Sequence, residues 1–390
     1  MHKNSGAVLS REAYRIFSDG CIRMPLNTIV SEKILVALSG GVDSAVAAHL
    51  LKQRGYEVHG IFFRSWQNET ELWQACPWKE DLESARAVAE HLQIPFEVIN
   101  FIDIYRKKVV DYLIEGYRSG QTPNPDVMCN RYIKFGILVE HMHTAGFNGL
   151  ATGHYVRKIE QNGTFSLDEG VDKNKDQSFF LCLVKKENLA NVHFPLGNLT
   201  KPEVRRIAAE IGLPNAQRKD SQGICFLGSS RVSINDFLEK YIPDAPGDIV
   251  TLDGKILGQH RGLHRYTIGQ RKGIGLPSNC DFEHYVVVAK DYQTKQLIVG
   301  FDHPETHGLY TNRVRIGFLN FLETPPKDGE MLLAKPRYRD PSQIVTWHWL
   351  DKATAELSFH EPQRALAVGQ ALAFYREDCL IGGGIYREIL

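Results

Sequence analysis

The sequence predicts an α/β protein in which a helix-covered parallel β-sheet is followed by all-β structure, as one or two small β-barrels. Two observations lead to this prediction. Strand-like and helix-like segments alternate over about the first 230 residues, as they do in βαβ units. From about Tyr241 onward, short apolar runs are separated by turn residues, which predicts all-β structure to the end.

The first element is an apolar strand, Ile34 to Leu38, which enters the turn "SGGVDS" and continues as a helix as far as Gly55. A glycine-rich turn between a strand and a helix presents backbone N–H groups and the positive helix end to an anion. Asp43 would repel a phosphate unless a cation lay between them, so we expect Mg²⁺ at Asp43. The turn lacks the lysine of a Walker A loop. A plain capped turn is the alternative interpretation.

The following elements continue the alternation. Alternating strands and amphipathic helices imply a parallel sheet that is covered on both faces. In order they are the strand Val58–Phe63, the helix Glu80–Leu92, the strand Phe96–Phe101, a helix with Val109, Tyr112, Leu113 and Tyr117, and a short strand that runs into Ala151–His154.

Later segments have clear local signals. In "LTKPEVRRIAAEIG", Thr200 and Glu203 predict a capping box at the start of a helix that ends at Gly212. "HYVVVAKDYQTKQLIVG" and "IVTWHWLDKATAELSFH" each predict a β-hairpin in the C-terminal half.

Composition limits the classes of function. A chain of 390 residues that is 43% hydrophobic can fill the cores of two or three domains. The 46 basic side chains are balanced by 46 acidic ones, so any nucleic-acid contact must use local basic patches. No apolar run approaches transmembrane length, so no membrane partner is expected. Seven widely spaced cysteines without a CxxC pair argue against a zinc ribbon and favour a reducing compartment.

Residues 1–30 are predicted to be an N-terminal extension. They contain no long apolar stretch of the kind found in secretory signals. Arg11, Arg15 and Arg23 with few acids are weakly typical of a transit peptide, and an irregular bacterial N-terminus is the simpler interpretation. The predicted location is therefore the cytoplasm, with the mitochondrial matrix as the alternative for a eukaryotic protein.

Two cysteines lie in loops shaped by proline or glycine. "TPNPDVMCNRYIKF" delivers Asp126 and Cys129 at the entrance to a predicted helix, where the pKa of a thiol is lowered. Arg131 or Lys134 would assist, and Asp126 could move a proton. "KDSQGICFLG" places Cys225 in a polar turn. Each cysteine alone is also compatible with a buried, inert thiol, but the pair favours thiol chemistry.

Two basic stretches carry aromatic rings. Residues 255–272 hold five Lys and Arg side chains and no acid, and "KPRYR" holds three more around a tyrosine. Basic residues interleaved with rings suit RNA backbone and splayed bases. A solvated strand face is the alternative for each stretch.

The motifs together resemble a known family. "SGGVDS" resembles the PP-loop of the ATP pyrophosphatase superfamily, whose members adenylate a substrate oxygen with ATP. The ordered set "SGGVDS", "NPDVMCN", "ATGHY", "GVDKNKDQSFFL", "FPLGNLTKPEVR", "KDSQGICF" and "LHRYTIGQRKGIG" is similar to the tRNA-specific 2-thiouridylase family over about residues 33–390.

The resemblance implies a fold, an activity and partners. The fold is an adenine nucleotide alpha hydrolase-like domain, and the cofactors are ATP and Mg²⁺. The activity is conversion of the wobble uridine of certain tRNAs to 2-thiouridine. A persulfide donor protein, either a sulfur relay protein or a cysteine desulfurase, is the second partner besides tRNA. The implied domains are residues 31–238 for ATP binding and thiolation, 239–306 for a central tRNA-contacting domain, and 307–390 for a β-barrel.

The resemblance also implies roles by position. Cys129 falls at the nucleophile, Cys225 at the persulfide carrier and Asp126 at the acid/base. These roles imply a Cys129–Cys225 disulfide after turnover without reductant. Phe63 stands where a Met is expected, and Glu169 where the family often has Arg. Implied ATP contacts are Ala37, Leu38, Ser39, Gly40, Gly41, Val42, Asp43, Ser44, Phe63 and Gly153. Implied tRNA contacts are Asn124, Pro125, Asp126, His154, Asp176, Gln177, Ser178, Arg337, Tyr338 and Gln370.

The implied chemistry is physically reasonable. A uracil oxygen is a poor leaving group, whereas AMP is a good one, and a persulfide needs only a lowered pKa to attack. The target base must leave its stack to reach both reagents.

Two alternatives to this function stay open. One is another PP-loop enzyme, such as an amidotransferase-type synthetase or a different tRNA thiolase, and the other is a tRNA-binding protein that has lost catalysis.

Overall fold

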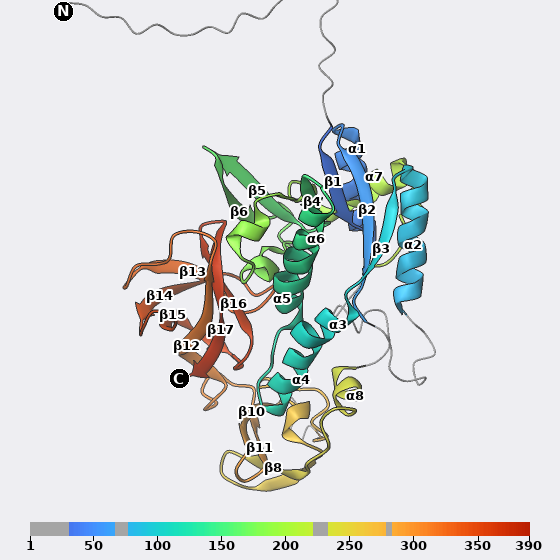
Figure 1. Cartoon of the computed structure of the whole chain (residues 1–390). Helices are drawn as coiled ribbons and strands as arrows, with labels where there is room; N and C mark the ends of the chain where they lie inside the picture. Colours follow the sequence, from blue (N-terminus) through green and yellow to red (C-terminus); the bar gives the residue numbers. More distant parts are fainter. Residues whose placement is uncertain (1–30, 67–76, 221–232, 278–282) are drawn as a thin grey trace, which may run out of the picture. The chain divides into compact units, whose positions relative to one another are not determined.

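A five-stranded parallel sheet forms the first part of the molecule (Figure 1). The computed structural model describes residues 31–66, 77–220, 233–277 and 283–390. The strand order is β3-β2-β1-β4-β7, and every neighbouring pair is parallel, as predicted. The strands are β1 (Lys33–Ala37), β2 (Glu57–Arg64), β3 (Phe96–Asn100), β4 (Gly149–Ala151) and β7 (Val192–His193).

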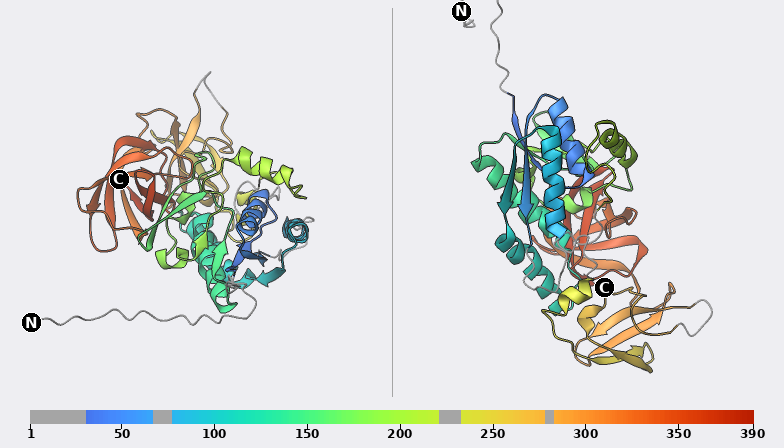
Figure 2. Two further views of the ribbon diagram at one scale, coloured as in Figure 1. Left: turned by 90° about the horizontal axis from the view of Figure 1, so that it is seen from above. Right: turned by 90° about the vertical axis from the view of Figure 1, so that its right-hand side faces the viewer.

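Helices cover both faces of this sheet (Figures 1 and 2). Along β1, Ile34 and Val36 belong to one buried cluster and Leu35 to another, because successive side chains point to opposite faces. The first face is covered by α1 (Val42–Gln53), α2 (Pro77–Leu92) and α7 (Lys201–Glu210). The second is covered by α3 (Ile102–Tyr105), the π-helical segment η1 (Arg106–Val110), α4 (Asp111–Arg118), α5 (Pro125–Cys129), the π-helical segment η2 (Asn130–Ile137) and α6 (Leu138–Thr144).

The predicted capping box at α7 is confirmed. One carboxylate oxygen of Glu203 accepts hydrogen bonds from the backbone N–H and from the hydroxyl of Thr200, both at 2.7 Å. These bonds lower the pKa of Glu203. Gly212 follows the helix with a φ of 67°, the left-handed conformation that favours glycine at a helix end.

A small four-stranded sheet follows the α/β part, with the order β10-β11-β8-β9. The predicted hairpin is confirmed, because β10 and β11 pair antiparallel. The elements of this part are α8 (Ile234–Leu238), β8 (Gly247–Thr251), β9 (Ile256–His260), the 3₁₀ turn η5 (Leu263–Arg265), β10 (Tyr285–Asp291) and β11 (Gln296–Phe301).

The last six strands close into an antiparallel barrel, as predicted. Their order is β12-β15-β14-β13-β16-β17, and β17 pairs back with β12. Trp347, Phe374 and Tyr386 fill the interior and are fully buried. The strands are β12 (Tyr310–Phe321), β13 (Met331–Lys335), β14 (Gln343–Trp349), β15 (Ala355–Arg364), β16 (Ala371–Arg376) and β17 (Cys379–Ile389).

One hairpin was not predicted. β5 (Val156–Gln161) and β6 (Thr164–Glu169) pair antiparallel, and β6 joins β17 of the barrel at Asp168 and Cys379. Asn162 and Gly163 form the turn with φ values of 51° and 75°. Asn-Gly is a strong hairpin signal, which the βαβ interpretation of this region overlooked. The 3₁₀ turns η3 (Ser178–Leu181) and η4 (Lys186–Leu189) follow before β7.

No helix within the described ranges combines the length and the apolarity that crossing a membrane requires.

Candidate active site

The turn after β1 is built to accept an anion. The hydroxyl of Ser44 donates to the Gly41 carbonyl at 3.1 Å and accepts from the Ser39 N–H at 3.1 Å. Helix α1 begins at Val42, and no described side chain caps its N-terminus at Gly41. The backbone N–H groups of its first turn therefore remain available to a ligand.

Two glycines fix the shape of this turn. Gly40 has a φ of 79°, and a Cβ there would lie 2.4 Å from the carbonyl oxygen of Asp81. Gly153, just beyond β4, packs so closely on α1 that a Cβ would lie 2.7 Å from the Ser44 nitrogen. Backbone atoms cannot move aside as a flexible side chain can, so neither position accepts a larger residue without a shift.

The sequence-predicted ATP residues come together at one edge of the sheet, which we call the ATP edge after this prediction. β2, β1 and β4 are adjacent and parallel, so that Phe63, the Ser39–Ser44 turn and Gly153 all lie at or just beyond the carboxyl ends of neighbouring strands. In parallel sheets this edge is where ligands bind. The Phe63 ring packs on Phe101, with ring centres 6.0 Å apart.

Asp43 already has a cationic partner within the protein. The ammonium of Lys201 lies 2.7 and 2.9 Å from the two carboxylate oxygens, and the hydroxyl of Tyr155 donates to Asp43 at 2.8 Å. Burial and the negative charge of Asp43 raise the pKa of Tyr155. Sequence reasoning missed both partners. The expected Mg²⁺ at Asp43 stays a prediction.

Asp220 links the same lysine to two further cations. It lies 2.7 Å from Lys201, 2.6 Å from Lys175 and 2.8 Å from Arg205. Burial opposes its ionisation, but hydrogen bonds from Lys175 and Lys201 outweigh this and lower the pKa of Asp220 to about 2. Asp220 directly precedes residues 221–232. Cys225, the predicted persulfide carrier, therefore lies outside the described residues, as does its predicted disulfide with Cys129.

Cys129 lies one turn inside its helix rather than at the first residue. Asn124 is the N-cap and accepts a hydrogen bond from the Val127 N–H at 3.1 Å, and Pro125 occupies the first helical position. Cys129 is the fifth residue, 1% exposed, and the π-helical segment η2 follows it directly. Asp126 lies in the first turn. Cys129, Cys182 and Cys379, the cysteines of the described ranges, form no disulfide with one another.

The loop before Cys129 contacts the barrel end of the chain. The Asn124 amide donates to the Gln370 side chain at 3.4 Å, and the Thr122 N–H donates to the Val368 carbonyl at 2.8 Å. Two predicted tRNA-contact positions that are 246 residues apart, Asn124 and Gln370, are thus brought together.

His154, another predicted tRNA position, is a buried residue. Its ring lies 5.4 Å from the ring of Phe135 and 6.3 Å from that of Phe194, and Nδ1 is 2.8 Å from the Thr152 hydroxyl. Burial, aided by the charge of Lys134, lowers the pKa of His154 well below its ordinary value. In this state the ring is a neutral packing residue beside the ATP edge.

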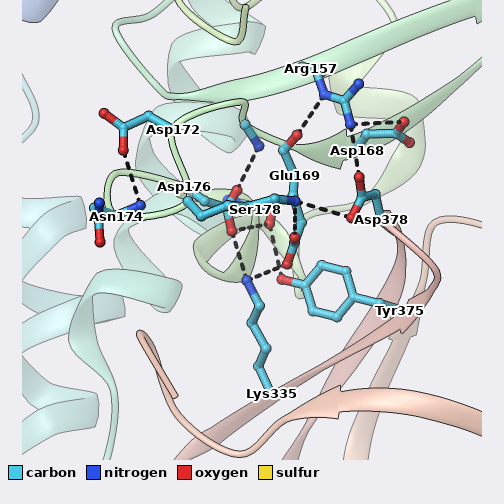
Figure 3. Close-up of polar contacts among 12 residues, drawn as sticks. Arg157, Asp168, Glu169, Asp172, Asn174, Asp176, Ser178, Lys335, Tyr375 and Asp378 are labelled. Carbon is cyan, nitrogen blue, oxygen red and sulfur yellow. Dashed lines mark hydrogen bonds and ion pairs between the residues drawn. The ribbon is translucent and has the colours of Figure 1, made fainter. Parts of the chain in front are cut away.

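Asp176 and Ser178 lie in a buried polar network (Figure 3). Asp176 accepts from the Ser178 hydroxyl at 2.9 Å and from the ammonium of Lys335, on the barrel strand β13, at 2.9 Å. Ser178 also contacts the Tyr375 hydroxyl at 3.0 Å. Lys335 forms a second ion pair with Glu169. The side chains of Asp176 and Ser178 therefore join the α/β part to the barrel in this state.

The remaining predicted tRNA positions are partly exposed or face the ATP edge. Arg337 forms an ion pair with Asp340 at 2.8 Å, and the Tyr338 ring packs 4.3 Å from Phe180. Gln177 accepts a hydrogen bond from the Tyr155 N–H at 3.1 Å. Contact of all these positions with tRNA stays a prediction.

Comparisons with known proteins identify the family. Family models described as "tRNA methyl transferase HUP domain", "tRNA methyl transferase PRC-barrel domain" and "Aminomethyltransferase beta-barrel domain" match residues 32–229, 235–301 and 311–386. A tRNA-specific 2-thiouridylase MnmA from Akkermansia muciniphila is 47% identical over 359 residues, which cover 92% of this chain and 99% of that protein. The chain belongs to the tRNA-specific 2-thiouridylase family.

Other relatives agree with this family. Proteins of the same name from Neisseria gonorrhoeae and Methylobacillus flagellatus are 45% and 42% identical, over 91% and 93% of this chain and 95% and 100% of theirs. Among solved structures, a 4-thiouridine synthetase–RNA complex with bound ATP has a TM-score of 0.35 at 18% identity, over 54% of this chain and 50% of that chain. A score this low supports no inference.

The ATP edge of this chain contains three candidate functional residues that the sequence analysis did not select: Lys201, Asp220 and Tyr155. Lys201 lies in the very segment that was recognised for its capping box, and Asp220 lies in "KDSQGICF". Both residues lie in recognised motifs, but a sequence motif does not predict which carboxylate forms an ion pair with a given lysine. Tyr155 belongs to "ATGHY", and its contact with Asp43 spans 112 residues.

Proposed function

We propose that this protein is a tRNA-uridine 2-sulfurtransferase. It uses ATP to adenylate the C2 oxygen of the wobble uridine and then replaces that oxygen with sulfur, giving 2-thiouridine, AMP and pyrophosphate. The observation that carries the proposal is the 42–47% identity, over more than nine-tenths of the chain, to relatives named tRNA-specific 2-thiouridylase.

ATP is the proposed adenylating substrate, and the residues of the turn fit it. The uncapped first turn of α1 and the two glycines, Gly40 and Gly153, offer N–H groups and close approach to a phosphate. The uracil oxygen attacks the α-phosphorus, and pyrophosphate leaves. Mg²⁺ is the proposed metal, and the carboxylate of Asp43 is an oxygen ligand of the kind it prefers. It would supply charge neutralisation for the leaving pyrophosphate.

Sulfur transfer uses the two proposed cysteines. Cys225 carries an outer persulfide sulfur received from a donor protein. The Cys129 thiolate attacks the inner sulfur of that persulfide, which releases sulfide and forms a Cys129–Cys225 disulfide. The sulfide displaces AMP from C2, and a thiol reductant restores both cysteines. In the other route, the Cys129 thiolate first displaces AMP from C2 of the base. The outer sulfur of the Cys225 persulfide then displaces Cys129 from C2, and attack of Cys129 on the inner sulfur leaves 2-thiouridine and the Cys129–Cys225 disulfide. Asp126 is the proposed acid/base beside the base.

The proposed tRNA contacts are the sequence-predicted positions, and the proposed location is the cytoplasm. A decisive experiment incubates the full-length protein with ATP, Mg²⁺, a persulfide donor and unmodified tRNA, followed by mass analysis of the nucleosides. We expect 2-thiouridine only when ATP is present. A methylated nucleoside formed with a methyl donor, without 2-thiouridine, would instead favour the activity suggested by the descriptions of the family models.

Cysteine variants test the mechanism. Cys225→Ser should accept no sulfur and form no 2-thiouridine, yet still release pyrophosphate on tRNA. Cys129→Ser should accept sulfur without completing transfer. Cys379→Ser, at a half-buried position on the barrel strand β17, is the matched control and should stay active. Normal thiolation by Cys129→Ser, with no Cys129–Cys225 disulfide in peptide maps after a single turnover, would show that Cys129 only packs the core.

A further inference from the structure

A row of alternating cations and rings lies beside the segment that carries Cys129. The guanidinium of Arg131 lies 4.8 Å from the ring centre of Phe318 and 5.4 Å from that of Tyr132. The ammonium of Lys108 lies 5.2 Å from the Tyr132 ring. We call these four side chains, Lys108, Tyr132, Arg131 and Phe318, the cation–aromatic ladder. They come from η1, η2 and the barrel strand β12.

Phe318 has an unusual backbone for a bulky residue. Its φ is 53°, and it lies where the pairing of β12 with β17 shifts between Gly317 and Asn320. A positive φ is strained for an aromatic residue, whereas Gly or Asn would adopt it easily. Phe318 is nevertheless 39% exposed. Core packing therefore does not explain a large ring in this strained and partly exposed position.

The ladder carries positive charge without local neutralisation. Lys108 and Arg131 form no ion pair with a carboxylate anywhere in the described parts of the chain, whereas Arg313, elsewhere on β12, pairs with Glu356 at 2.6 Å. Arg387 is a further exposed cation, and its side chain lies 3.1 Å from where a Cβ on Gly317, the residue before Phe318, would be. Surplus cations beside exposed rings favour a polyanion that has flat bases.

The ladder lies close to the proposed nucleophile, Cys129, in sequence and in space. Arg131 follows Cys129 by two residues where α5 passes directly into η2, before the kink at Phe135. Asn124 caps α5 and donates its backbone N–H to the Tyr112 hydroxyl. Burial raises the pKa of Tyr112 to about 12, although this hydrogen bond and the nearby positive charge of Arg387 both lower it. The cap of the Cys129 helix and the cationic surface therefore lie close together.

We propose that the cation–aromatic ladder stacks a nucleotide that flanks the target uridine of the tRNA. The Phe318 ring offers its face to the base, and Lys108 and Arg131 meet the adjoining phosphates. Holding a neighbouring base would keep the strand in place while the target base leaves its stack. This inference rests on the proposed function for its RNA, and it adds a contact surface that no sequence motif indicated.

Fluorescence with the full-length protein tests the ladder. The probe is an anticodon stem–loop RNA that carries 2-aminopurine next to the target uridine, because stacking on a ring quenches that base. Phe318→Leu keeps apolar bulk and loses the ring, whereas Phe318→Trp keeps a ring. Phe165→Leu is the matched control, since the Phe165 ring also lies under two lysine ammonium groups, at 4.6 and 5.3 Å, but on the β5–β6 hairpin.

We expect wild type, Phe318→Trp and Phe165→Leu to quench the probe equally. Phe318→Leu should lose the quenching and raise Kd by about 5- to 150-fold, the range expected for one lost base–ring stack. Wild-type quenching and Kd in Phe318→Leu would overturn the proposal. If Phe318→Leu does not fold, Arg131→Gln replaces it and should lower the salt slope of binding by about one unit. An unchanged slope would equally overturn the proposal.

Failure of the proposed function would look different. Ring-dependent quenching by a wild-type protein that makes no 2-thiouridine would remove the thiolation activity and leave the ladder as an RNA-binding surface. Thiolation by a wild type whose RNA binding ignores Phe318 would leave the activity and remove the ladder.

Discussion

Single charged residues at the ATP edge are held by partners that are far away in sequence. The ammonium of Lys201 lies between Asp43 and Asp220, and its side chain is 11% exposed. A lysine in this position neutralises two carboxylates that would otherwise repel each other and repel a phosphate. The Asp43 carboxylate can therefore lie next to a phosphate site even before any metal ion binds.

Asp220→Asn gives a pH-dependent prediction at the same scale. The pKa of Asp220 is about 2 in the folded protein, against an ordinary value of 3.8. A carboxyl with a lowered folded-state pKa stabilises the fold above its unfolded pKa and loses that effect as the pH falls through the folded pKa. The variant should be less stable than wild type by about 2 kcal/mol at pH 7, and the gap should close between pH 4 and 2. Urea unfolding of both proteins from pH 7 to pH 2 measures this difference in the free energy of unfolding. A difference that does not change with pH would contradict the argument.

Secondary-structure elements were predictable where the local signal was strong. β2, α2, β3 and the capped α7 follow from periodicity and capping residues, because those signals act within a few residues. The π-helical segment η2, directly after Cys129, was not predictable, since one extra residue per turn leaves no pattern in the apolar spacing. Likewise, "NPDVMC" predicted a helix entrance for Cys129, but only the fold shows that its side chain is buried.

The close packing of a strand end on a helix start gives a prediction at the element scale. Gly153→Ala would place a Cβ 2.7 Å from the Ser44 nitrogen and 2.8 Å from the Asp43 carbonyl carbon. The first turn of α1 must then shift, and overpacking of this kind costs about 1–3 kcal/mol. We expect the Kd for ATP to rise about tenfold or more. Gly258→Ala, where a Cβ would meet its nearest atom at 3.6 Å, is the control. Equal ATP affinity in both variants would show that Gly153 does not shape the site.

At the scale of the whole molecule, a short segment links a barrel side chain to the ATP edge. Lys335 on β13 bonds Asp176, and the next residue, Gln177, accepts the N–H of Tyr155. The Tyr155 hydroxyl in turn bonds Asp43. The order of an α/β part followed by β-rich parts was predictable from the pattern of apolar and turn residues along the sequence. This connection was not, because two of its three contacts join side chains that are more than a hundred residues apart in the sequence.

Lys335→Met tests how much this connection stabilises the molecule. The side chains of Lys335, Glu169 and Asp176 are only 13%, 10% and 3% exposed. Burial disfavours the charge on Lys335, but the two carboxylates outweigh this and raise the pKa of Lys335. Removing the ammonium leaves the buried Asp176 without its cation, while Glu169 keeps only its pair with Lys173, so the free energy of unfolding should fall by about 3 kcal/mol. Lys335→Met combined with Glu169→Gln and Asp176→Asn should recover most of that loss, because the groups that remain are uncharged. Arg206→Ala, which breaks an exposed pair with Glu210, should change stability by less than about 0.5 kcal/mol. Urea unfolding of the four proteins decides the matter: if Lys335→Met loses no more than Arg206→Ala, the network does not hold the barrel to the ATP edge.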